Sequence, residues 1–151
     1  MAFVNEEYSA EDKPLVDRLV KRRPPLTRIP GSSIPGLSEW TVDRERDAFL
    51  VLVGKEGGTY EGTQEIRHYV LVLGEHEIHF SGEYHVTGYR SKGEPQIMTW
   101  TIHQLSVPSS LASQKEEALA LVREALDAQG LYHCRESLAS VIINFNPALA
   151  L

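Results

Sequence analysis

The chain has 151 residues, of which 42% are hydrophobic and 24% charged, and its formal net charge is −6 at pH 7. This length suits one domain with a buried core, and no apolar run approaches the roughly 20 residues that a membrane helix needs. The acidic balance disfavours direct nucleic-acid binding, which requires a basic surface. The chain has a single cysteine, Cys134, so it forms no internal disulfide, and its first eight residues lack the apolar segment of a secretory signal. We therefore expect a cytoplasmic protein.

Residues 1–36 are predicted to form an appendage made of a short helix and a proline-rich arm. Residues 9–12 resemble a capping box, and Leu15, Val16 and Leu19 follow at helical spacing. Four prolines and two glycines then occur between positions 24 and 36, a composition typical of an extended segment without its own core. The division into residues 1–36 and a single domain over residues 37–151 follows from this change in composition.

The remaining chain reads mainly as strands separated by turn signals. The apolar run at residues 48–53 indicates a central strand covered on both faces, whereas the glycine-rich residues 54–62 indicate a loop. The predicted strands span residues 39–43, 48–53, 66–73, 75–89, 96–107 and 141–145, with a further short strand at residues 131–135.

One long helix is predicted after residue 108. Ser113 and Glu116 have the spacing of a capping box, Val122 and Leu126 belong to an apolar stripe, and Gly130 is a suitable C-terminal stop. Strands in succession followed by one helix favour an α+β fold. We expect an antiparallel meander sheet of about five to six strands, with this helix on one face and the short N-terminal helix besides.

Residues 75–107 are predicted to form a hairpin with one apolar and one polar face. Side chains alternate along a strand, so His79, Glu83 and His85 share a face opposite Ile78 and Phe80. If the hairpin turns near Lys92, His85 lies near Thr99 and His79 lies opposite His103 or its neighbours. A slip of one residue would move His103 to the apolar face.

The histidines of this hairpin suggest metal chemistry, but their spacing matches no metal-ligand motif. The tripeptide at residues 85–87 is a single His-x-Thr element, without the second copy that paired phosphoesterase elements require. The sequence also lacks a nucleophile elbow and a phosphate-binding glycine loop. We therefore expect no metal, no cofactor and no enzymatic activity.

Acidic residues concentrate beside the polar face: six acids and one base occur within residues 56–83. Complementary charge steers association, so we interpret the chain as a small acidic binding protein, of a bacterial immunity or antitoxin type, that occludes a basic protein partner. It would contact neither nucleic acid nor membrane. The expected contact residues are Glu77, His79, Glu83, His85, Tyr89, Arg90 and Tyr60.

Two other interpretations remain open. In the first, the histidine-bearing face binds a small molecule or a metal ion, with or without an enzymatic activity. In the second, the chain is a structural subunit whose proline-rich arm reaches a neighbouring subunit.

Overall fold

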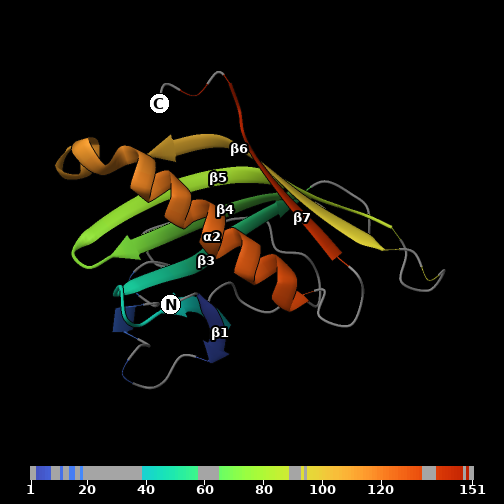
Figure 1. Ribbon diagram of the computed structural model, residues 1–151, viewed down its shortest axis with the longest axis horizontal. Helices are drawn as coiled ribbons and strands as arrows, with labels where there is room; N and C mark the ends of the chain where they lie inside the picture. Colours follow the sequence, from blue (N-terminus) through green and yellow to red (C-terminus); the bar gives the residue numbers. More distant parts are fainter. Residues whose placement is uncertain are drawn as a thin grey trace.

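The computed structural model describes residues 3–7, 11, 14–15, 18, 39–57, 65–88, 93, 95–133, 139–147 and 149. A seven-stranded sheet and one long α-helix make up most of this part of the chain (Figure 1). The strands lie side by side in chain order. They are β1 (Val4–Glu7), β2 (Glu39–Asp43), β3 (Ala48–Gly57), β4 (Glu65–Leu73), β5 (His76–Thr87), β6 (Gln96–Ser106) and β7 (Ala139–Phe145). A 3-10 helix, η2 (Ser109–Gln114), leads into α2 (Lys115–His133).

The sheet is mixed rather than purely antiparallel. Strands β1 to β6 pair antiparallel, whereas β6 and β7 pair in parallel. The reason is the crossover: α2 carries the chain back along the sheet, so β7 starts at the same end as β6. The α+β class is confirmed, but the expectation of a purely antiparallel meander is wrong for the last strand. Strand β1 adds one member to the predicted set.

Two hydrophobic clusters cover the two faces of the central strands. The inner face packs on α2, and its cluster includes Leu50, Leu71, Phe80 and Trp100. The second cluster lies on the opposite face and consists of Val42, Val51, Val53, Val70 and Val72, with Leu15 and Phe49 packed against it. Because alternate residues of β3 enter the two clusters, the prediction that residues 48–53 form a strand covered on both faces is confirmed.

Helix α2 begins and ends at positions other than those predicted. Ser113 lies within η2 and is exposed, so it does not cap α2. Gly130 lies inside the helix, which continues to His133 and thereby replaces the start of the short strand predicted at residues 131–135. Relative to alanine, a glycine within a helix costs only about 1 kcal/mol of stability. The burial of Val122 and Leu126 against the sheet stabilises the helix by more than this cost.

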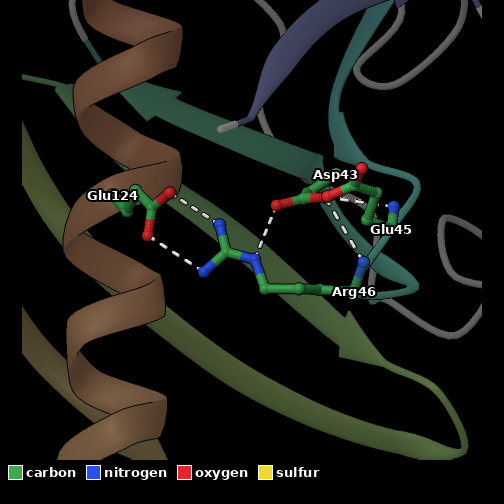
Figure 2. A network of polar contacts seen from close by, with 4 residues as sticks. All are labelled: Asp43, Glu45, Arg46 and Glu124. Carbon is green, nitrogen blue, oxygen red and sulfur yellow. Dashed lines mark hydrogen bonds and ion pairs between the residues drawn. The ribbon is translucent and has the colours of Figure 1, made fainter. Parts of the chain in front are cut away.

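Neighbouring residues of α2 reach opposite ends of the sheet. Glu124 accepts two hydrogen bonds, of 3.1 and 2.6 Å, from Arg46 in the β2–β3 turn (Figure 2). The guanidinium of Arg123 lies 4.8 Å from the ring centroid of Phe145 in β7. The helix contacts β1, β2 and β7, so the sheet curls around it and both end strands approach the same helix.

Two predictions for the first half of the chain fall largely outside the described residues. The described structure has one α-helix, α2, so the expected short N-terminal helix is not shown. Of residues 1–36, only 3–7, 11, 14–15 and 18 are described, of which 14–15 and 18 are helical, and β1 is a strand that the sequence did not predict. Strand β3 continues through Gly57, so the first part of the predicted glycine loop is strand instead. Within the described residues, no helix has the length and apolar character needed to cross a membrane.

Candidate functional site

The face of β4–β7 that points away from α2 carries Glu83 and His85 of the predicted site, and we call it the outer face. Ile66 of β4, Ile97 of β6 and Ile142 of β7 are respectively 41%, 37% and 43% exposed on it. Glu83, His85, Thr99, Thr101 and Asn144 have the same orientation as these isoleucines by strand alternation. The outer face therefore combines exposed aliphatic side chains with polar ones.

Cross-strand pairing fixes how these side chains are arranged. Glu83 pairs with Ile66 on one side and Thr101 on the other. His85 pairs with Thr99, which in turn pairs with Ile142. The predicted proximity of His85 and Thr99 is thus confirmed. The parallel pairing of β7 brings Ile142 into the same row.

A β-bulge changes the register farther along the hairpin. Ser81 pairs with Gln104 and Gly82 pairs with Ile102, so His103 is the additional residue of β6. As a result His79 pairs with Ser106, and the predicted pairing of His79 with His103 is wrong. The bulge leaves His103 on the outer face, with its Nε2 3.2 Å from Oε1 of Glu83.

The histidines of this region bind separate partners instead of converging on one point. Nδ1 of His68 lies 2.6 Å from the hydroxyl of Ser81, and Nε2 of His79 lies 3.0 Å from Oε1 of Glu77. Nδ1 of His85 is buried and makes no hydrogen bond within the described structure. Nowhere in the described part do three or more His, Cys, Asp or Glu side chains gather in an arrangement that could hold a metal ion.

The predicted contact residues separate into two groups along β5. Oε2 of Glu77 accepts a hydrogen bond of 3.1 Å from Arg18, which leaves the side chain of Glu77 17% exposed. Glu83 lies six residues farther, about 20 Å at strand spacing, and its side chain is 40% exposed. Glu83 and His85 therefore belong to the open outer face, whereas Glu77 and His79 lie beside an N-terminal residue. Tyr60, Tyr89 and Arg90 lie outside the described residues.

The exposed isoleucines were not identified from the sequence. Ile97 shares its parity with Thr99 and Thr101, and this signal alone would have placed it on the polar face. Ile142 carries no comparable signal, because the run at residues 141–145 is apolar at three successive positions. Its position on the outer face depends on the pairing of β7 with β6.

No family model matches the chain, and no curated protein or solved structure matches it significantly. Inferences about function therefore rest on the residues themselves.

A buried polar cluster that the sequence pattern did not predict lies on the inner face. Arg67 and Glu65 are each 9% exposed, and Nε of Arg67 donates a hydrogen bond to Oε1 of Glu65. The guanidinium carbon lies 3.7 Å from the ring centroid of Tyr84. The hydroxyl of Tyr69 donates a hydrogen bond of 2.7 Å to Gln129 of α2, so the cluster joins β4 to the helix.

The electrostatics of this cluster favour a permanently charged arginine. Burial disfavours the charge of Arg67, but its interactions with Tyr69 and with the carboxylate of Glu65 outweigh burial and raise the pKa of Arg67. Burial raises the pKa of Tyr69, which keeps its hydroxyl protonated as the donor to Gln129. Because the guanidinium is already paired with a carboxylate and stacked on a ring, we assign the cluster to stability rather than chemistry.

Proposed function

We propose that this protein binds a basic protein partner through the outer face and acts by occluding it, in the manner of an immunity or antitoxin protein. The observation that carries the proposal is the distribution of exposed apolar side chains. Of the four large hydrophobic residues that are exposed in the described part, three lie on the outer face: Ile66, Ile97 and Ile142. Exposed aliphatic groups gathered on one surface are typical of a protein interface.

Charge supports the choice of a basic partner. The chain has a net charge of −6, and the outer face carries Glu83, whose side chain is 40% exposed, between Ile66 and Thr101 and beside His103. Apolar contacts surrounded by charged and polar groups match the usual anatomy of an interface. A negative surface accelerates association with a positively charged partner and disfavours partners of like charge.

An affinity capture from the native host tests the proposal with charge-reversed variants. Wild-type protein is expected to retain a basic protein in about equal molar amount, and added salt is expected to reduce the retention. Glu83→Lys and Ile97→Lys should each lower the retention of that same protein about tenfold or more, because they place a positive charge within the contact.

Glu117→Lys provides the matched control, because Glu117 is exposed on α2 and the charge change is identical to that of Glu83→Lys. This variant should retain the partner as well as the wild type does. Urea unfolding of all three variants checks that exposed substitutions leave the fold intact. Equal retention of the captured protein by wild type, Glu83→Lys and Ile97→Lys would contradict the proposal, as would an acidic captured protein. Occlusion further requires that the purified partner lose its activity at a one-to-one ratio.

The alternative is a ligand site on the same face, and one observation favours it: Nδ1 of His85 is buried without a hydrogen-bond partner among the described residues. A bound ion or polar ligand would satisfy that nitrogen. Zinc added to the wild type should then raise its melting temperature, and His85→Ala should remove the effect. An unchanged melting temperature on addition of zinc counts against the metal version.

A further inference from the structure

Strand β7 lies at the end of the sheet, and one of its edges pairs with no strand of the described structure. The backbone N–H of Asn146 donates to the carbonyl of Ile102 in β6 over 2.9 Å, so even-numbered residues of β7 direct their backbone groups to β6. Odd-numbered residues direct theirs to the other edge. An independent contact agrees, since Nη1 of Arg123 donates a hydrogen bond of 2.7 Å to the carbonyl of Ile143.

Toward the described part of the chain, the free edge of β7 therefore presents the N–H groups of Val141, Ile143 and Phe145 together with the carbonyls of Val141 and Phe145. The carbonyl of Ile143 is occupied by Arg123. A row of unpaired donors and acceptors is a template for an additional strand. Among the described residues, the side chain of Arg123 occupies part of that row through the carbonyl of Ile143.

An open depression of about 360 Å³ lies between β7 and α2 and includes Arg123, whose side chain reaches this edge. Its lining combines aliphatic and charged groups, consisting of Ala120, Arg123, Glu124, Asp127, Val141 and Ile143. Arg46 already binds Glu124, whereas Asp127 is exposed. The depression thus offers an apolar floor from β7 and a carboxylate on the helix side.

We propose that the free edge of β7 accepts an extended segment of the basic partner as an eighth strand, with a lysine or arginine side chain of that segment beside Asp127. Main-chain hydrogen bonds to the edge supply affinity, and the depression selects the side chain. The identity of the segment as part of a basic partner rests on the proposed function. The edge itself is defined by the backbone alone.

Charge favours such a segment over a second copy of this chain. Two copies that paired through β7 would each bring a net charge of −6 and would place the Asp127 carboxylates near the same interface. Like charges oppose that association, whereas a basic segment is attracted. The same edge is continuous with Ile142 of the outer face, so one partner can contact both surfaces.

The experiment uses the full chain and synthetic peptides, so that no natural partner is required. The probe is an acetylated, amidated heptapeptide that alternates lysine with valine, titrated against ¹⁵N-labelled protein. In one matched peptide, glutamate replaces lysine. In the other, proline replaces valine, which keeps the charge but prevents the peptide from forming a strand. The lysine–valine peptide should shift the amide signals of Val141, Ile143 and Phe145 and slow their hydrogen exchange. It should bind about tenfold or more tightly than either control peptide.

Two substitutions locate the peptide on the protein. Asp127→Lys should weaken binding about fivefold or more, while Glu117→Lys on the same helix should change it less than about twofold. Val141→Pro removes an edge-facing N–H and leaves the β6-facing groups in place, so it should abolish the amide shifts. If Val141→Pro does not fold, the comparison of Asp127→Lys with Glu117→Lys decides the question.

Three results would overturn the inference. They are unchanged β7 amides at millimolar peptide, equal binding of the lysine–proline peptide, and a dimer in which the β7 edge is protected without any peptide. Failure here is distinguishable from failure of the proposed function, because Glu83→Lys and Ile97→Lys should bind the peptide normally. A further combined result is that those variants lose partner capture while the peptide leaves the β7 amide signals of the wild type unchanged. That result would support the outer face as the contact surface and exclude the β7 edge.

Discussion

Arg67 is a charged side chain in the core, and its position depends on three elements of the fold. Glu65 precedes it on β4, Tyr84 on β5 supplies the ring beneath it, and Gln129 on α2 binds the neighbouring Tyr69. The acidic residues within positions 56–83 predicted an acidic surface beside the polar face. Glu65 is one of these residues, but its side chain is buried. The parity of Arg67 with Tyr69 and Leu71 was the available sign that it faces inward, but its ion-pair partner and the helix contact depend on packing.

Arg67→Met should destabilise the protein strongly, by about 3–5 kcal/mol, because the carboxylate of Glu65 would remain buried without its counter-ion. Chemical denaturation with urea at neutral pH measures the change. The double variant Glu65→Gln with Arg67→Met should recover part of the loss, since it removes the unpaired charge. A loss below about 1 kcal/mol for Arg67→Met would show that the cluster contributes little to stability.

The β5–β6 hairpin determines which residues share the outer face, and two glycines allow its geometry. Gly88 has a φ of 90°, and a Cβ there would lie 2.2 Å from the carbonyl oxygen of Pro95. At the bulge, a Cβ on Gly82 would lie 2.9 Å from both Ile102 Cδ1 and the carbonyl oxygen of Thr101. The alternation of residues along both strands predicted the two faces, but nothing local to the sequence indicated the bulge that separates His79 from His103.

Gly82→Ala should lower the unfolding free energy by about 1–3 kcal/mol, because the new methyl group overlaps backbone that has little room to move. It should also shift the amide signals of His103 and Gln104 at the bulge. Gly93→Asn serves as the control: Gly93 has a φ of 70°, a Cβ there would meet nothing within 4 Å, and Asn tolerates that conformation. An unchanged stability for Gly82→Ala would contradict the close approach at the bulge.

At the scale of the whole molecule, α2 holds the two ends of the curled sheet. Asp43 is buried and accepts hydrogen bonds from the backbone N–H of Glu45 and Arg46 and, over 2.5 Å, from Nε of Arg46 (Figure 2). The other side of the same guanidinium binds Glu124. This set of contacts links the β2–β3 turn to the helix that also contacts β7.

Arg46→Met should reduce stability more than Glu124→Gln does, because it leaves the buried Asp43 carboxylate without a counter-ion. The Arg46–Glu124 pair is itself more than a third exposed and is screened by solvent, so Glu124→Gln should cost less than about 1 kcal/mol. Urea unfolding of both variants at neutral pH compares them. The reverse order of the two losses would show that the helix contact, and not Asp43, dominates.

The same network predicts a pH dependence with a definite sign. Desolvation opposes the charge of Asp43, but hydrogen bonds from the side chain and backbone of Arg46 outweigh it and hold the pKa of Asp43 below its ordinary value of 3.8. A group whose folded pKa is lowered stabilises the fold above that ordinary value, and the stabilisation disappears as the pH falls through the folded pKa. The difference in stability between wild type and Arg46→Met should therefore be present at neutral pH and shrink below about pH 3.8.

Local sequence patterns were sufficient for the α+β class, most strand positions and the two faces of the β5–β6 hairpin, because these follow from a period of two or 3.6 residues over short distances. Packing between distant segments was needed for the rest. The parallel pairing of β7, the bulge at Gly82 and the extension of α2 through Gly130 each depend on such contacts. They also determine which aliphatic residues remain exposed and which edge of the described sheet remains unpaired, because exposure is a property of the packed sheet rather than of any one strand.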